Sequence, residues 1–77
     1  MVISDVVDGS QVAGLGVVKD DELLEAAGVQ ASAGLAAIVA ALGGRGDQPA
    51  SVQLRRWEVV YTVELAAGAI GWAITEQ

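Results

Sequence analysis

An alternation of side-chain types between residues 57 and 65 constrains this chain more than any other feature. Large apolar side chains occupy every second position, and most of the polar ones lie between them. A period of two is typical of a strand with one buried face, and β-branched and aromatic side chains suit a pleated surface. The apolar face of this strand is expected to hold Trp57, Val59, Tyr61, Val63 and Leu65.

A second alternation follows after a short break. Ile70, Trp72 and Ile74 share one face of an extended segment. The Ala-Ala-Gly sequence at residues 66–68 can reverse the chain between the two segments, because glycine adopts positive φ without strain. We therefore predict a closing hairpin with strands over residues 53–65 and 69–76, in which Trp57 and Trp72 are core anchors.

The chain also begins with a pattern typical of a hairpin. Residues 2–7 form a short apolar run, and Asp8-Gly9-Ser10 is a strong signal for a tight turn. Residues 11–18 then return as a predicted second strand, although two glycines weaken it.

The middle of the chain predicts a helix over residues 20–44. Asp20 or Asp21 can cap its first turn, which is acidic and so suits the helix dipole. A single apolar stripe follows at helical spacing, and Gly43-Gly44 ends it. Gly28 marks a break or kink within it. The stripe consists of Leu24, Gly28, Ala31, Leu35, Ile38 and Leu42.

These segments together predict a β-β-α-β-β order and the α+β class, with an antiparallel sheet covered on one face by a central Ala-rich helix. With 77 residues the chain forms one small domain over residues 1–77. A core of this size is marginal alone, so pairing in a homo-oligomer is favoured.

The composition excludes much chemistry. The chain has no cysteine and no histidine, so it lacks thiolate sites, the commonest metal ligand and the base of a usual serine nucleophile. We therefore expect no enzyme activity, no metal and no cofactor. The net charge of −6 disfavours nucleic acid and anionic membranes. The absence of cysteine and of a basic segment after Met1 favours the cytoplasm.

Three polar motifs are more simply interpreted as surface. Glu58 and Glu64 lie on one strand face about 20 Å apart by strand rise, too far for paired acid–base work. Arg55-Arg56 could hold an anion, but such residues usually form surface ion pairs. The Arg-Gly-Asp tripeptide at residues 45–47 matches an integrin-binding sequence and is more simply a loop.

Residues 8–13 read DGSQVA, which resembles the D-G-x-x-V-A turn of Roadblock/LC7 domains. The Ala-rich segment and closing strands are similar in order to the rest of that fold, although its first and last helices have no counterpart here. The resemblance implies a non-enzymatic adaptor that dimerises through its central helices and sheet edges. Its partner would be a small GTPase or a sister adaptor. It assigns the turn to Asp8 and Gly9, and the pairing surface to Ala33, Ala37, Ala40 and Ala41.

Two alternatives remain open from the sequence. Residues 26–44 and 57–74 can be taken as a two-helix membrane hairpin, with Trp57 and Trp72 about 22 Å apart by helical rise. Glu64 would then be an intramembrane carboxylate of an ion- or proton-handling subunit. Residues 20–28 also resemble the end of a peptide-export leader, which would make the remainder a secreted, membrane-active peptide.

Overall fold

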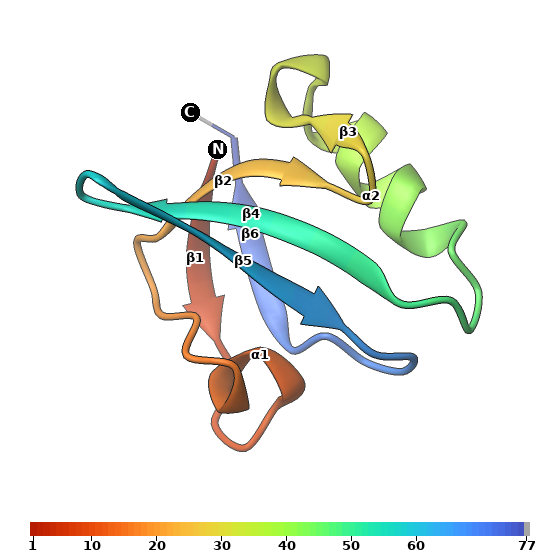
Figure 1. The fold of residues 1–77 in the computed structure, drawn as a ribbon, viewed down its shortest axis with the longest axis horizontal. Coiled ribbons are helices and arrows are strands. Elements are labelled where there is room, and N and C mark those ends of the chain that lie inside the picture. Colours follow the sequence, from red (N-terminus) through yellow and green to blue (C-terminus); the bar gives the residue numbers. More distant parts are fainter. Residues whose placement is uncertain (77) are drawn as a thin grey trace.

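The computed structural model describes residues 1–76 and confirms the α+β class, with a six-stranded antiparallel sheet and a helix packed on it (Figure 1). The strand order is β5-β4-β2-β1-β6, and β3 pairs with β2 beside this path. The elements in chain order are β1 (Val2–Val6), α1 (Gln11–Gly14), β2 (Glu22–Ala26), β3 (Val29–Gln30), the 3-10 turn η1 (Ala31–Ala33), α2 (Leu35–Gly43), β4 (Ala50–Arg56), β5 (Val59–Leu65) and β6 (Trp72–Thr75).

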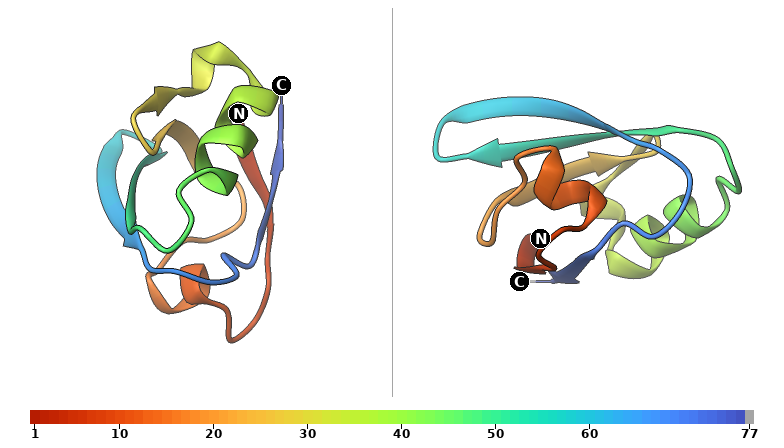
Figure 2. Two further views of the ribbon diagram at one scale, coloured as in Figure 1. Left: turned by 90° about the vertical axis from the view of Figure 1, so that its right-hand side faces the viewer. Right: turned by 90° about the horizontal axis from the view of Figure 1, so that it is seen from below.

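The sheet curves strongly, so that its two outer strands lie on different sides of the molecule (Figure 2). The helix α2 packs against β2 and β3, and α1 lies at the other end of the molecule (Figure 1). The apolar side chains of the strands and both helices meet in one core. That core contains Ile3, Val12, Val17, Leu23, Ala26, Ile38, Leu42, Ala50, Val52, Leu54, Val63 and Leu65.

The predicted second strand over residues 11–18 is wrong, because this segment contains the short helix α1. Asp8 and Gly9 form a turn, with φ of 77° at Gly9, but the turn leads into a helix. The Ser10 hydroxyl accepts a hydrogen bond from the N–H of Ala13 at 3.3 Å and so caps α1. A local cap therefore outweighs the weak strand preference of a segment that contains two glycines.

The predicted helix over residues 20–44 is wrong in its first half. Residues 22–30 form the β2–β3 hairpin, whose turn has positive φ at Ala27 and Gly28. A register shift between Leu23 and Glu25 interrupts the pairing of β2 with β4, so that both Leu23 and Ala26 are buried. Because of this bulge, two buried residues lie three positions apart in the sequence. That spacing is typical of a helix, which is why the sequence predicts a helix for this segment. Residues 31–33 form the 3-10 helix η1, and only α2 is α-helical; it ends before Gly44 as predicted.

The strand predicted over residues 53–65 is in fact the β4–β5 hairpin. Arg56 pairs with Val59, so Trp57 and Glu58 form its two-residue turn. Trp57 has φ of 58° and is 93% exposed, so it is not a core anchor. The apolar alternation continues through the turn, because both strands place alternate side chains in the same core.

The predicted closing hairpin between residues 53–65 and 69–76 does not form. β5 pairs with β4, whereas β6 pairs with β1 at the opposite edge of the sheet. The intervening residues 66–71 cross the end of the molecule as a loop (Figure 2). Trp72 is half-buried against the core, as predicted for a core residue.

Among residues 1–76 no helix is long and apolar enough to cross a membrane. The segment that the membrane alternative takes as a helix contains β5 and β6, and Glu64 is exposed on β5.

Candidate functional site

A groove of about 590 Å³ lies between α2 and β6, which are side by side in both views of Figure 2. Its walls are mostly apolar, and its one charged side chain is that of Arg45. It therefore suits a ligand with apolar groups and a negative charge. The lining residues are Val39, Leu42, Gly43, Arg45, Gly46, Gly68, Ile70, Gly71, Trp72 and Ile74.

The strand wall of the groove is the outer edge of the sheet. β6 pairs with β1 on one side, and no strand among residues 1–76 pairs with its other side. An edge strand presents unpaired N–H and C=O groups to its surroundings. The groove therefore combines a hydrogen-bonding strand edge with an apolar helix face.

The loop of residues 66–71 closes one end of the groove. Gly68 and Gly71 have φ of 106° and 91°, which is the left-handed region. Within the described chain, the backbone N–H groups of residues 68–71 donate to no acceptor. Successive unpaired N–H groups in a turn that includes a left-handed residue form a favourable site for an anion.

The segment from Ser10 to Val12 holds this loop in place. The Gln11 side chain donates to the carbonyl oxygens of Ala66 and Ala69 and accepts from the N–H of Ala66. The N–H of Val12 donates to the Ile70 carbonyl at 3.3 Å. A Cβ at Gly71 would overlap the Ser10 side chain, so the loop and α1 approach closely.

Arg45 contributes the positive charge of the groove. Its guanidinium donates to the carbonyl oxygens of Gln48, at 2.9 Å, and Gly68, at 3.4 Å. Among residues 1–76 no carboxylate lies within ion-pair distance of it. The guanidinium is therefore fixed beside the loop and retains a charge for a ligand.

The residue that follows β6 also contacts α2. The Glu76 carboxylate accepts a hydrogen bond of 2.7 Å from the N–H of Leu35, in the first turn of α2. Gly34, at the N-cap position, has no side chain for this role. Glu76 thus caps the helix from the far end of the chain.

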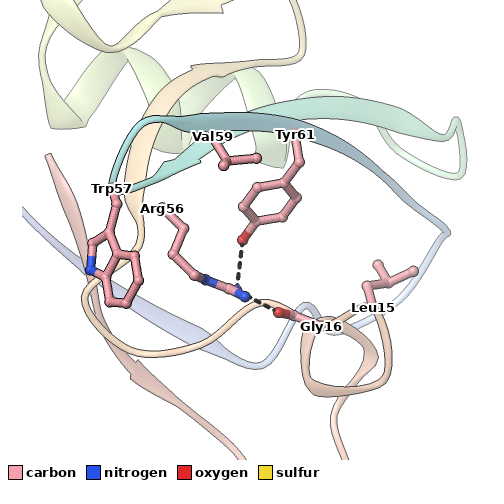
Figure 3. A pocket seen from close by; sticks show the side chains of 6 residues that line it. All are labelled: Leu15, Gly16, Arg56, Trp57, Val59 and Tyr61. Atoms are coloured by element: carbon pink, nitrogen blue, oxygen red, sulfur yellow. Dashed lines mark hydrogen bonds between the residues drawn. The ribbon is translucent and has the colours of Figure 1, made fainter.

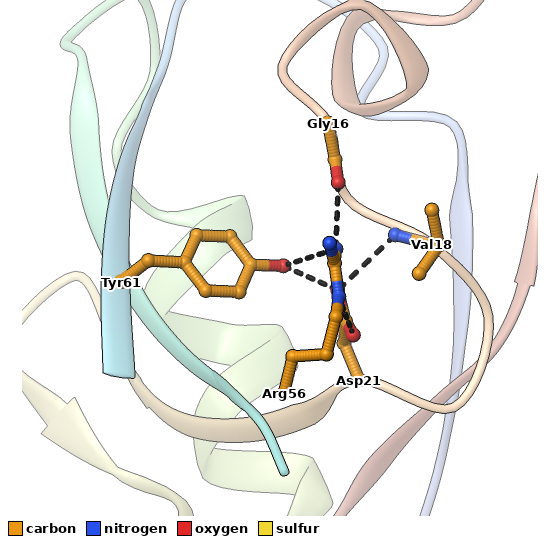
Figure 4. Close-up of polar contacts among 5 residues, drawn as sticks. All are labelled: Gly16, Val18, Asp21, Arg56 and Tyr61. Atoms are coloured by element: carbon orange, nitrogen blue, oxygen red, sulfur yellow. Dashed lines mark hydrogen bonds and ion pairs between the residues drawn. The ribbon is translucent and has the colours of Figure 1, made fainter. Parts of the chain in front are cut away.

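A polar cluster lies away from the groove, around the carboxylate of Asp21 (Figure 4). Asp21 is 2% exposed and accepts hydrogen bonds from Arg56 at 2.7 and 2.8 Å, from the Tyr61 hydroxyl and from the N–H of Val18. Arg56 also donates to the Gly16 carbonyl. The cluster ties the β4–β5 hairpin to the segment after α1.

The ionisation of this cluster follows from its contacts. Burial alone would raise the pKa of Asp21, but hydrogen bonds from Arg56, Tyr61 and Val18 outweigh it and lower that pKa below 3.8. Burial and the hydrogen bond to Asp21 raise the pKa of Tyr61 to about 12. Asp21 is therefore a fixed anion near neutral pH, in a structural ion pair with Arg56.

A second cavity, of about 440 Å³, lies beside this cluster (Figure 3). Figure 3 shows the Tyr61 ring pointing toward the Arg56 guanidinium, while Trp57 extends outward on the other side of that arginine. Arg56 is already paired with Asp21, so this cavity offers an apolar surface and no uncompensated charge. It suits contact between surfaces better than recognition of an ion.

The residues singled out in the sequence do not converge on one site. Ala33 lies in η1, whereas Ala37, Ala40 and Ala41 lie on α2, and no long central helix joins them. Pairing through these alanines stays a prediction. Arg55 pairs with Glu22 and Arg56 with Asp21, so neither is a free anion site. Among residues 1–76 no cluster of three acidic side chains could hold a metal.

Sequence reasoning missed the groove because residues 69–76 were expected to pair with residues 53–65. A sequence signal against this pairing was nevertheless present, because Gly68 and Gly71 flank a short apolar segment. In the predicted hairpin Gly71 would lie inside the second strand, where glycine is unfavourable.

No protein-family model, curated protein or solved structure matches the chain, so no relative indicates its function.

Proposed function

We propose that this chain is a non-enzymatic interaction domain that binds the C-terminal end of an extended peptide in the groove between α2 and β6. The single observation that carries the proposal is the free β6 edge, which lies beside an apolar helix face and ends at a loop of unpaired N–H groups. Strand addition to a free sheet edge is a general mode of peptide recognition, used for example by PDZ and PTB domains.

The main chain of the peptide would pair with β6. That edge is four residues long, which suits a short segment. Alternate side chains of an extended peptide point to the same side. Those that face α2 would contact Val39 and Leu42 on the helix wall, with Ile70 and Trp72 opposite. The peptide is therefore expected to carry apolar residues at its last position and at the third from its end.

The terminal carboxylate of the peptide would lie at the loop end of the groove. The N–H groups of residues 68–71 and the guanidinium of Arg45 supply the donors and the positive charge there. A peptide bound antiparallel to β6 runs from the Glu76 end toward this loop, so its C-terminus lies at the loop. An internal segment would have to continue past the loop, so a free chain end fits better.

The wider class inferred from the sequence, a self-associating adaptor, is compatible with this proposal. A small GTPase or a sister adaptor as partner stays a prediction, because the groove recognises a peptide end rather than a particular protein. The membrane hairpin depends on a helix over residues 57–74, where the structure has strands.

The test is a titration with pairs of acetylated hexapeptides that end in Val, Leu or Ile, each made with a free carboxylate and as its amide. We expect micromolar binding of the acids by calorimetry and at least tenfold weaker binding of the amides, which is about 1.4 kcal/mol. Backbone NMR shifts should map to residues 68–76 and α2. Equal binding of acids and amides, or shifts confined to other residues, would contradict the proposal.

The matched variants are Arg45→Gln and Arg55→Gln. Both remove one arginine charge, but only Arg45 lines the groove. Arg45→Gln should weaken binding of the acids and leave that of the amides nearly unchanged, whereas Arg55→Gln should alter neither.

A further inference from the structure

The strand β5 is the other outer edge of the sheet, at the opposite end of the strand order from the groove (Figure 1). It is seven residues long and pairs with β4 in an unbroken register from Val59 to Leu65. No main-chain hydrogen bond joins it to any described element other than β4. One side of this strand is therefore open along its whole length.

This edge lacks the usual protection against pairing. Natural edge strands are often short, bulged, or interrupted by proline or lysine. Residues 59–65 contain no proline, lysine or arginine, and Glu64 is their only charged side chain. β6, in contrast, is short, and its pairing with β1 includes a register shift.

Apolar side chains are also exposed along the open strand. Val59 is 65% exposed and Val60 is 53% exposed, on opposite faces of the strand, and Trp57 precedes them in the turn. Exposed apolar residues that continue along a free edge are typical of an interaction surface. Neither the core nor the groove uses them.

We propose that β5 pairs with β5 of a second copy of this chain, antiparallel, about a two-fold axis at Thr62. An axis perpendicular to the sheet keeps the core faces of both copies on the same side. Thr62 then lies opposite Thr62, Tyr61 opposite Val63, Val60 opposite Glu64, and Val59 opposite Leu65. All seven residues of each edge are paired.

Charge favours this register over the one with its two-fold axis at Tyr61. An axis at Tyr61 would place Glu58 of each copy opposite Glu64 of the other, and like charges directly opposite are destabilising. At Thr62 no charged residue of one edge faces a like charge of the other. The contact is therefore self-complementary, as a two-fold interface must be.

The assembly ends at two copies. A dimer that uses both β5 edges leaves only the β6 edges, and these are short and adjoin α2. The two grooves would then lie at opposite ends of one continuous sheet. A partner with two suitable chain ends could engage both and gain avidity.

A single introduced cysteine provides the test, because the chain has no cysteine of its own. In the proposed dimer the two Thr62 Cβ atoms are about 4.5–5.5 Å apart, about 1 Å more than a disulfide spans, so a small adjustment of the two edges brings two cysteines into bonding range. Thr62→Cys should form a disulfide-linked dimer under mild oxidation. The control is Gln53→Cys, which is also exposed but lies opposite Thr62 on β4, one strand inside the edge. It should cross-link at least tenfold more slowly.

Sedimentation of the full chain gives an independent readout. Thr62→Lys places two positive charges opposite each other and should weaken the dimer at least tenfold. Gln53→Lys should leave it unchanged. A 1:1 mixture of Thr62→Lys and Thr62→Glu should recover association, since the charges are then opposite in sign. A monomeric wild type at several hundred micromolar, or equal cross-linking of both cysteine variants, would overturn the proposal.

Discussion

Gly71 is the residue on which the geometry of the groove most depends. Its φ is 91°, and a Cβ at this position would overlap the side chain of Ser10. Both the backbone conformation and the close approach therefore require glycine. The unpaired N–H groups of the loop keep their direction only while this contact holds.

We therefore expect Gly71→Ala to lower the free energy of unfolding by more than about 2 kcal/mol, by strain and by displacement of the loop. Gly14→Ala is the matched control. Gly14 is helical, and a Cβ there meets nothing within 4 Å, so this change should be neutral or stabilise by up to about 1 kcal/mol. Urea unfolding of both variants measures the difference, and equal midpoints would contradict it.

At the residue scale, Asp21 determines how the free energy of unfolding depends on pH. Asp21 is buried, but the Arg56 side chain is 43% exposed, so solvent screens part of the ion pair. Removal of the Asp21 charge by Asp21→Asn should therefore cost about 1–2 kcal/mol at pH 7. The folded pKa of Asp21 is lowered, so its contribution is complete above the unfolded value near 4 and is lost as pH falls through the folded value.

The difference in unfolding free energy between wild type and Asp21→Asn should therefore shrink below about pH 4. The neighbouring Asp20→Asn is the control. Asp20 is exposed with φ of 77°, a conformation that asparagine tolerates, so its effect should stay within about 0.5 kcal/mol. A difference that persists unchanged to pH 2 would show that the Asp21 charge is not responsible.

At the scale of elements, the β4–β5 hairpin combines two long amphipathic strands with an unfavourable turn. Trp57 takes a positive φ that glycine and asparagine adopt more readily, and it is almost fully exposed. Pairing of seven residues on each strand outweighs this local cost.

Trp57→Gly should consequently stabilise the monomer by up to about 1 kcal/mol, because glycine adopts this positive φ without strain. This gain is expected even though the change removes a tryptophan side chain. Thermal unfolding at low micromolar concentration, which disfavours self-association by mass action, is the measurement. Trp72→Gly is the control, because Trp72 packs against the core and its loss should cost about 3 kcal/mol or more. A loss of stability in Trp57→Gly beyond about 0.5 kcal/mol would mean that the tryptophan packs in the monomer.

At the scale of the whole molecule, both peptide binding and self-association should raise the melting temperature. A ligand or a second copy that binds only the folded chain stabilises it by mass action. The melting temperature of the wild type should rise with protein concentration, and that of Thr62→Lys should not. A carboxylate peptide at 100 times its Kd should add about 2.7 kcal/mol to both. A concentration dependence that survives in Thr62→Lys would contradict the β5 contact.

The sequence by itself determined the class of the fold and several local features. The α+β class, the strand between residues 59 and 65 and the end of α2 at two glycines each follow from patterns within a few residues. Such patterns depend on the side-chain period and on backbone freedom, which are local properties.

Only the tertiary structure decided which strands pair, because pairing joins residues far apart in the chain. The bulge opposite Leu54 gave β2 a helical spacing, and the alternation through Trp57 concealed a turn. Residues 72–75 could join either of two strands by their local pattern, and the core selected β1. The groove exists only because of that choice, which leaves a free edge beside α2.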